Sequence, residues 1–304
     1  MYLTGFADEA AEDIGGQIKA TRELGWRNIE ARSVDGENIN DVPDEQFEAA
    51  CAKFEQAGVK VNCLGSVIAN WSKQVTDPFE ATLAEVHRAI GRMRRLGAKF
   101  IRIMSYAVLE GRGPDDQMEQ ERFRRLREVS RMFTDADLVP LHENCMNYGG
   151  MGRTYTLKLV ENAPGLKLVF DTGNPVSADD RAKGRPYPKQ SSWDFYSHVR
   201  EHIAYVHIKD GVWDVREGKM TATFAGEGDG DVKRIVKDLL DNGYDGGFSM
   251  EPHLSVVFHD SGVTSSDEVR YANYVEYGRR FMKLIEEIGH GDKLAGVVRC
   301  WLSR

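Results

Sequence analysis

The sequence predicts an α/β protein, a single (β/α)8 barrel that spans residues 1–304. Short apolar runs alternate with amphipathic helical stretches along the whole chain, the pattern of repeated β-α units in a parallel sheet. Eight such units fill the chain at about 38 residues each, which suits a closed barrel. The first strand-to-helix turn, FADEAAEDIGG, lacks the glycine pattern of dinucleotide-binding folds, which disfavours a doubly wound sheet.

The expected elements follow one another in strict alternation. Apolar runs predict strands at residues 2–7, 28–32, 59–66, 100–107, 139–145, 166–174, 203–210 and 247–253. Helical periodicity predicts helices at about 10–25, 44–57, 78–97, 116–136, 152–163, 192–201, 231–242 and 266–288, most ending near a glycine or proline. Residues 290–304 lie beyond the eighth unit as a C-terminal extension. Its apolar LAGVVRCWL either packs under the barrel or contacts a second subunit of a homo-oligomer.

Composition excludes several classes of protein. The chain carries 40 basic and 48 acidic residues, a net charge of −8, which argues against a nucleic-acid partner. No apolar run is long enough to span a membrane, and the start, MYLTGFADEA, is no signal peptide. The 4 cysteines lack CxxC spacing and are expected to be reduced thiols. These features together predict a cytoplasmic protein.

Four strand ends in the second half of the chain each carry one candidate metal ligand. They are Glu143 in PLHENC, Asp171 in VFDTGN, His207 in YVHIKD and Glu251 in FSMEPH. Their spacings of 28, 36 and 44 residues each fit one β-α unit with its loop. Strand ends of this kind meet at one rim of a barrel. Three carboxylates and an imidazole suit one divalent metal ion (Mn, Mg, Co or Zn) and leave positions open for substrate oxygens.

Each of these residues alone has an ordinary structural explanation, as a helix cap, a solvated loop residue or a buried histidine. Side chains along a strand alternate between its two faces, and this alternation directs all four toward the barrel axis. Asp171, for example, shares the face of Val169, which points toward the barrel axis. Four polar side chains converging there would be costly to bury without a cation. The group as a whole therefore predicts a metal site.

Seven short motifs run in order from residue 4 to residue 254. They are TGFADE (4–9), IEARSVDG (29–36), PLHEN (140–144), VFDTGN (169–174), VHIKD (206–210), AGEGDG (225–230) and SMEPHL (249–254). With them the chain resembles the xylose-isomerase-like TIM-barrel superfamily, in the group labelled sugar phosphate isomerase/epimerase. That superfamily includes ketose 3-epimerases, hydroxypyruvate isomerases, inosose and dehydroshikimate dehydratases, and apurinic endonucleases. The resemblance therefore specifies the fold more narrowly than the activity.

The resemblance implies that the four strand-end residues hold one divalent cation. In the family's epimerases two glutamates also act as the acid–base pair, one on each face of the substrate carbon, and Glu143 and Glu251 match their positions. Many relatives have a histidine three residues after the strand-six aspartate, where this chain has Asn174. An amide can orient a substrate hydroxyl but cannot transfer a proton. The departure also removes a ligand that the multi-zinc endonucleases need.

These residues predict a divalent-metal-dependent isomerase or epimerase of a keto sugar or related polyol. A metal on the carbonyl oxygen stabilises an enediolate, so a carboxylate can remove the adjacent proton. Loss of a β-hydroxyl from the same enediolate would instead be dehydration, which makes a lyase acting on a keto sugar or an inosose-like substrate the alternative. A third hypothesis is a barrel that only binds a sugar acid or serves as a subunit of a larger assembly. Exchange of substrate protons with solvent would distinguish an isomerase, an epimerase or a lyase from such a non-catalytic barrel.

Further residues near the strand ends are candidates for substrate contacts. Lys209 lies two residues after His207 and either has a catalytic role or forms a plain salt bridge. Arg32 and His253 are candidates to bind substrate, with a salt bridge for Arg32 and loop solvation for His253 as the alternatives. Glu9 is expected to be solvated, and His142 to point away from Glu143 into the structure. Three aromatic residues could stack on a sugar or simply pack: Trp71, Tyr106 and Trp213.

The glycine-rich segment AGEGDG (225–230) has two interpretations. Such loops can bind phosphate through backbone N–H groups, and many barrels bind phosphate near this point. Here the segment and the next residue carry Glu227, Asp229 and Asp231, which would repel a phosphate dianion. We therefore expect a turn, and an unphosphorylated small-molecule carbohydrate as substrate.

Overall fold

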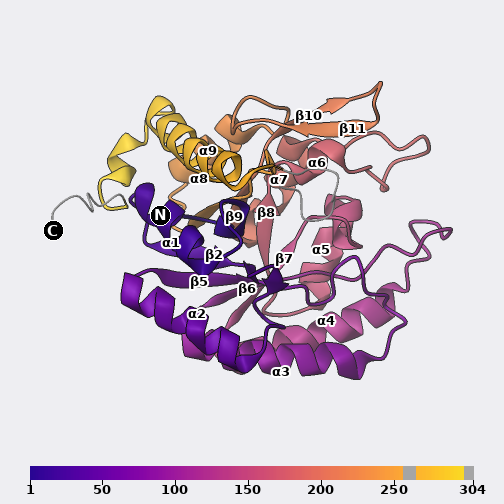
Figure 1. Cartoon of the computed structure of the whole chain (residues 1–304). Helices are drawn as coiled ribbons and strands as arrows, with labels where there is room; N and C mark the ends of the chain where they lie inside the picture. Colours follow the sequence, from indigo (N-terminus) through magenta and orange to yellow (C-terminus); the bar gives the residue numbers. More distant parts are fainter. Residues whose placement is uncertain (256–264, 298–304) are drawn as a thin grey trace.

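The computed structural model describes residues 1–255 and 265–297, and its centre is a parallel barrel (Figure 1). Eight strands form one sheet in the order β1-β12-β9-β8-β7-β6-β5-β2. Their bounds are β1 Tyr2–Gly5, β2 Asn28–Ala31, β5 Lys60–Gly65, β6 Phe100–Ile103, β7 Val139–Glu143, β8 Lys167–Asp171, β9 Ile203–Ile208 and β12 Gly247–Met250. Every pairing in this sheet is parallel. The predicted (β/α)8 class is confirmed.

The barrel is nearly closed between its first two strands. β1 and β2 lie at the two ends of the sheet order, and a single parallel bridge between Phe6 and Glu30 joins them just beyond β1. Glu30 thus takes part in the contact that joins the two ends of the sheet, and its side chain points into the barrel.

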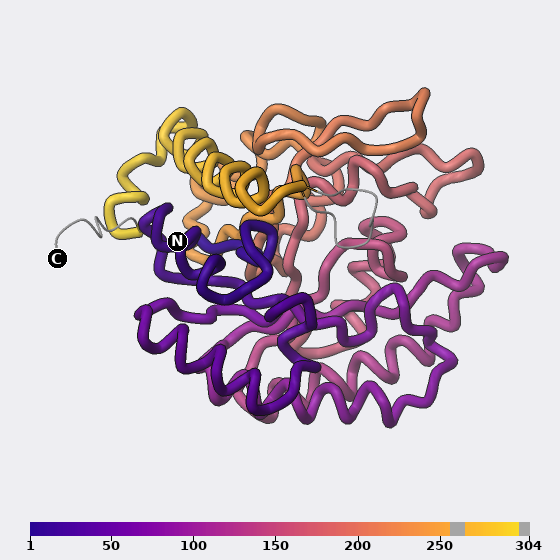
Figure 2. The backbone as a smooth tube through the Cα atoms, in the orientation of Figure 1, coloured from indigo at the N-terminus to yellow at the C-terminus, as the bar shows by residue number. Residues whose placement is uncertain are grey.

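Helices surround the strands on the outside (Figures 1 and 2). Their bounds are α1 Ile14–Glu23, α2 Asp44–Ala57, α3 Phe79–Leu96, α4 Glu119–Thr134, α5 Arg153–Asn162, α6 Asn174–Ser177, α7 Ser192–Val199, α8 Val232–Asp241 and α9 Asp267–Glu287. Capping sets several ends. The Asp13 side chain accepts a hydrogen bond from the Gly16 N–H, so α1 begins later than periodicity suggests. Gly58 and Gly97 end α2 and α3 in the left-handed conformation that glycine favours.

Two hairpins and a short helix interrupt the alternation on the side of the barrel where the strands end. The first hairpin pairs β3 Ser33–Val34 with β4 Glu37–Asn38, and the second pairs β10 Gly211–Asp214 with β11 Lys219–Ala222. The second hairpin projects beyond the helical ring near α6 (Figure 1). The sequence did not reveal these elements because β3 and β4 have two residues each, and because β10 and β11 are mostly exposed or half-buried and lack the apolar run that marks a barrel strand.

The core has an outer and an inner part. The larger cluster of buried apolar residues lies between strands and helices, while Cys63, Leu141, Val169 and Tyr205 form a small cluster of their own on inward-facing strand positions. Of the C-terminal extension, Leu294 is buried and Val297 packs against the large cluster; residues 298–304 lie outside the described residues. Within residues 1–255 and 265–297, no helix combines the length and apolarity needed to cross a bilayer.

Candidate metal centre

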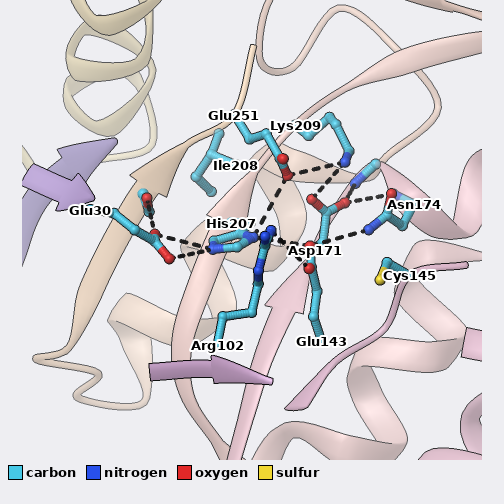
Figure 3. A network of polar contacts seen from close by, with 12 residues as sticks. Glu30, Arg102, Glu143, Cys145, Asp171, Asn174, His207, Ile208, Lys209 and Glu251 are labelled. Carbon is cyan, nitrogen blue, oxygen red and sulfur yellow. Dashed lines mark hydrogen bonds and ion pairs between the residues drawn. The ribbon is translucent and has the colours of Figure 1, made fainter. Parts of the chain in front are cut away.

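The four predicted ligands converge at the carboxyl ends of neighbouring strands (Figure 3). Glu143 ends β7, Asp171 ends β8, His207 lies near the end of β9, and Glu251 follows β12 directly. All four are buried, and each offers one ligand atom within 4.8 Å of the others. The strands are consecutive in the barrel order, so four distant sequence positions become one compact group.

Strand alternation explains why Glu143 faces this group while its neighbour does not. His142 points outward, where its Nε2 lies 3.0 Å from the Ser105 hydroxyl and 3.1 Å from Asn147 Oδ1. Burial lowers the pKa of His142 to about 4, so this imidazole is neutral at pH 7. Its predicted structural role agrees with these contacts.

His207 lies between two sets of carboxylates. Its Nδ1 is 3.2 Å from Glu143 Oε1 and 3.7 Å from Glu251 Oε2, on the side of the other predicted ligands. Its Nε2 faces the other way and lies 3.3 and 3.2 Å from the two oxygens of Glu30. Burial alone would lower the pKa of His207, but Glu30 and Glu143 outweigh it and raise the pKa to about 10.

Three buried lysine and arginine side chains contact the carboxylates of the predicted ligands. Lys209 Nζ lies 3.0 Å from Asp171 Oδ2 and 3.2 Å from Glu251 Oε2. Arg102 Nη1 lies 3.2 Å from Glu143 Oε2, and Arg32 Nη1 lies 3.0 Å from Glu251 Oε1. Burial would lower the pKa of Lys209, but the two nearby carboxylates raise it well above its usual value. Lys209 is therefore a persistent cation and hydrogen-bond donor, and a poor proton acceptor.

The carboxylates differ sharply in how well these cations stabilise them. Burial raises the pKa of Asp171 to about 7, and the Lys209 ammonium only partly offsets it. At Glu143 burial acts in the same direction, but Arg102 and His207 outweigh it and lower the pKa to about 2. Of the three carboxylates among the predicted ligands, Asp171 is thus the one whose charge the protein itself compensates least, and a metal ion bound there would stabilise that charge.

The charges of this cluster fit a divalent cation. Among the described residues, six buried carboxyl groups meet here with three buried lysine and arginine side chains: Asp8, Glu9, Glu30, Glu143, Asp171 and Glu251 against Arg32, Arg102 and Lys209. Counting the imidazolium of His207, the carboxyl groups still outnumber the positive charges by two, and such a buried excess is costly unless a further cation or a proton balances it. Oxygen-rich donors with one imidazole suit a hard or borderline divalent ion.

Asn174 and His253 lie beside the four ligands, as the sequence suggested. The Asn174 side-chain amide donates to Glu143 Oε1 at 3.5 Å, and its backbone N–H donates to Asp171 Oδ1 at 2.6 Å. His253 Nε2 lies 3.3 Å from Glu251 Oε1. The expected solvation of Glu9 and His253 is wrong: both are buried, and they contact each other, because the His253 backbone N–H donates to Glu9 Oε2 at 2.8 Å.

The cluster opens onto a cavity of about 820 Å³. Its floor includes Arg32, Arg102 and Lys209 together with Glu143 and Glu251, and Asn174 and His253 also line it. One wall is the β11 strand of the projecting hairpin, and Trp71 lies on another part of the lining. All the predicted catalytic and substrate-binding residues therefore reach one cavity, which has room for a small polyol.

The three aromatic candidates have different surroundings in the structure. Trp71 lines the cavity. Tyr106 is buried in the large apolar cluster, with its hydroxyl 3.2 Å from that of Thr82, so packing explains it. Trp213 lies on β10, where Lys189 Nζ sits 3.9 Å from its ring centroid.

The glycine-rich segment is a turn closed by Asp210. The Asp210 carboxylate accepts four backbone N–H hydrogen bonds at 2.8 to 3.1 Å, one from its neighbour Gly211 and three from Gly226, Gly228 and Gly230. Backbone N–H groups that a phosphate would need are therefore already bound by a carboxylate of the protein itself.

Three residues of the cluster escaped the sequence analysis, namely Asp8, Glu30 and Arg102. Arg102 and Glu30 are the last but one residues of β6 and β2, respectively, but the strands predicted at 100–107 and 28–32 placed both of them before the strand ends at which ligands were sought. A charged residue inside a short apolar run was the available signal, since an inward-facing charge in a barrel strand needs a partner.

Fold and site together define a TIM barrel with a buried Glu/Asp/His group that could hold a metal ion. The chain belongs to the xylose isomerase-like TIM barrel family, whose model matches residues 18–290. No curated protein matches the chain.

Solved structures share this fold at low sequence identity. A D-tagatose 3-epimerase-like protein has a TM-score of 0.68 at 15% identity, covering 97% of this chain and 100% of its own. A xylose isomerase-like protein from Mycobacterium smegmatis in complex with magnesium has a TM-score of 0.66 at 16% identity, covering 95% and 97%. A probable 3-DHS dehydratase from Bacillus anthracis has a TM-score of 0.64 at 15% identity, covering 90% and 97%.

Proposed function

We propose that the protein is a divalent-metal-dependent isomerase or epimerase of a keto sugar or related polyol. One observation carries this proposal: four buried ligand atoms from consecutive strand ends lie within 4.8 Å of one another, beneath a cavity of about 820 Å³. A magnesium complex and an epimerase-like protein among the structures of the same fold support it.

Glu143, Asp171, His207 and Glu251 would hold the ion, and the two glutamates would also transfer protons. A divalent ion bound there would stabilise negative charge on the substrate carbonyl oxygen and so acidify the adjacent C–H. β8 and β9 separate the strands of Glu143 and Glu251, so the two carboxylates approach the cavity from different sides. One removes a proton from the substrate carbon, and the other returns a proton to the opposite face or to the neighbouring carbon.

The other residues of the cavity floor would orient the substrate. Lys209 and Arg32 remain protonated and can donate to substrate oxygens, while the Asn174 amide can bind a hydroxyl group. His253 contacts Glu251 and would limit the orientations of that carboxylate. Each role is one of binding or positioning, which leaves proton transfer to the glutamates.

The charges favour a substrate without phosphate. A divalent ion would leave the buried cluster near neutrality, and a phosphate dianion would restore the excess of negative charge. The backbone N–H groups of the glycine-rich turn already bind Asp210. A neutral polyhydroxylated carbonyl compound meets both conditions.

A lyase that dehydrates a keto sugar or an inosose-like compound is the second candidate. The buried ammonium group of Lys209, 3.2 Å from Glu251, favours it, because a fixed cation can stabilise a departing hydroxyl group. The fold is also that of the probable dehydratase from Bacillus anthracis.

Incubating the metal-loaded protein in D₂O with a panel of keto sugars and inososes tests both candidates. Deuterium at the carbon beside the carbonyl, with the carbon skeleton and hydroxyl count retained, is expected for an isomerase or epimerase. Loss of water marks the lyase instead. Metal-free protein and the Glu143→Gln variant are the controls and should show neither. A wild-type protein that binds metal but exchanges no proton in any substrate would contradict the proposal.

A further inference from the structure

Glu30 is a buried carboxylate to which neither the four-ligand group nor the proposed proton transfer assigns a role. It belongs to β2, on the opposite side of the barrel from β7 and β8. Its side chain has no exposed surface, and it meets His207 across the barrel interior (Figure 3). Both Glu30 oxygens lie 3.2 to 3.3 Å from Nε2 of His207.

Contacts on two sides fix the position of Glu30. Ser249 lies beside His207 in the register of β12 and β9, and its hydroxyl donates to Glu30 Oε2 at 2.6 Å. The backbone of Glu30 forms the parallel bridge to Phe6 that brings β1 and β2 together. The Phe6 ring in turn meets the His207 ring edge-on, with centroids 5.0 Å apart. The Glu30 carboxylate and the His207 imidazole are therefore each held by a further contact besides the one that joins them.

An imidazole that binds a metal through one nitrogen carries its proton on the other. In His207 the two nitrogens face different groups: Nδ1 faces Glu143 and Glu251, whereas Nε2 lies 3.2 and 3.3 Å from the two oxygens of Glu30. A carboxylate that accepts the N–H of a ligating histidine fixes the tautomer and the ring orientation, and it makes the other nitrogen a better donor to the metal.

We propose that Glu30 is a positioning residue of the metal centre: it accepts the Nε2–H of His207 and thereby reserves Nδ1 for the ion. The inference rests on the proposed function, because it requires the metal to bind at the four-ligand group. It adds a fifth residue, from the other half of the barrel, that controls metal affinity without touching the ion.

Titrating Mn²⁺ into wild-type protein and three variants tests this assignment. Glu30→Leu removes the acceptor at similar size and should weaken Mn²⁺ binding about 10- to 100-fold. Glu30→Gln keeps an oxygen that can accept the Nε2–H, so its Mn²⁺ affinity should fall clearly less than that of Glu30→Leu. Thr4→Val is the matched control, because it removes a different buried hydrogen bond of the barrel interior, from Thr4 to Asn62 at 2.8 Å, and touches no ligand. It should bind Mn²⁺ as the wild type does.

A spectroscopic measurement separates positioning from a general loss of folding. In Zn²⁺-loaded protein labelled with ¹⁵N-histidine, the His207 ring, assigned with the His207→Ala variant, should carry its proton on Nε2. Glu30→Gln should keep that tautomer, while Glu30→Leu, if folded, should show a changed Nε2–H resonance.

The outcomes distinguish this inference from the proposed function. Wild-type protein without Mn²⁺ binding would overturn both. Wild-type binding with equal affinity in Glu30→Leu, equal losses in Glu30→Leu and Glu30→Gln, an equal loss in Thr4→Val, or a wild-type proton on Nδ1 would each overturn only the role of Glu30.

Discussion

The two halves of the barrel contribute to the candidate metal centre in different ways. The half formed by β7, β8, β9 and β12 supplies the four predicted ligands, each at or next to a strand end. The half formed by β1, β2, β5 and β6 supplies none of these four. This second half, which we call the partner half, contributes residues that contact three of them: Arg102 on Glu143, Arg32 on Glu251 and Glu30 on His207. The first half, called the ligand half, also supplies Lys209, which contacts Asp171 and Glu251.

This difference shows that a metal site in a barrel is built by the whole circumference. The ligand half has acidic groups that repel one another; the partner half stabilises Glu143 and Glu251 through ion pairs across the interior, and Lys209 of the ligand half stabilises Asp171. Changes in the ligand half should therefore affect metal binding and chemistry, whereas changes in the partner half should affect the stability of the metal-free protein and its response to metal.

The largest expected effect lies in the ligand half, at Glu251. Glu251→Gln keeps one oxygen ligand but cannot accept a proton, so turnover and solvent deuterium exchange should fall together by about 10²–10⁴-fold while much of the Mn²⁺ affinity remains. Steady-state kinetics and D₂O exchange on the substrate found in the panel measure this. Asp171→Asn should instead lose metal first and recover part of its activity in excess metal. Normal turnover of metal-bound Glu251→Gln would show that another group is the base.

The next largest effect is expected in the partner half, on the stability of the protein without metal, at Arg102. Arg102→Met leaves Glu143 buried without its cation, which should lower the free energy of unfolding of the metal-free protein by about 3–5 kcal/mol. Saturating Mn²⁺ should raise the Tm of this variant more than that of the wild type, because the ion replaces the missing positive charge. Thermal melts with and without Mn²⁺ measure both quantities. Equal Mn²⁺-induced shifts in variant and wild type would mean that Arg102 does not serve the site.

Removing the imidazole ligand should weaken metal binding more than changing any partner residue. Loss of a residue that only contacts a metal ligand typically lowers metal affinity by about 10- to 100-fold. His207 is itself a predicted ligand, so His207→Ala is expected to lower Mn²⁺ affinity by about 100-fold or more. His198→Ala, on the exposed face of α7, is the control and should bind normally. Calorimetric titration compares them. An affinity in His207→Ala close to that of the wild type would place the ion elsewhere.

The smallest effect compares two neighbours on β7, Glu143 inside the barrel and His142 outside it. The folded-state pKa of His142 is lowered to about 4 by burial, from about 6.5 when unfolded. A lowered histidine pKa means that stability is full above pH 6.5 and falls as the pH drops toward 4, by about 2 kcal/mol between pH 7.5 and pH 5. Urea unfolding at both values should show this loss in the wild type and a smaller one in His142→Gln. The same loss in both proteins would assign it to other groups.

Much of the ligand half could be predicted because its signals are local. Glu143, Asp171 and Glu251 each follow a short apolar run, and alternation from that run sets the direction of each side chain. Barrel geometry then brings strand ends to one rim. The hairpin of β10 and β11 gave a weaker local signal because its strands are mostly exposed or half-buried and lack an apolar run, and the helix α6 because it has only four residues.

The sequence by itself determined the (β/α)8 fold, the family and the four residues that meet at one end of the barrel. Only the tertiary structure decided which partner each one has. That Arg102 contacts Glu143, that Glu30 binds Nε2 of His207, and that Glu9 and His253 are buried all depend on side chains from distant strands meeting across the barrel. Periodicity reports which face a residue occupies along its own strand. Periodicity does not show which side chain lies opposite that residue across the barrel, because the register and the curvature of the closed sheet decide which side chains meet there.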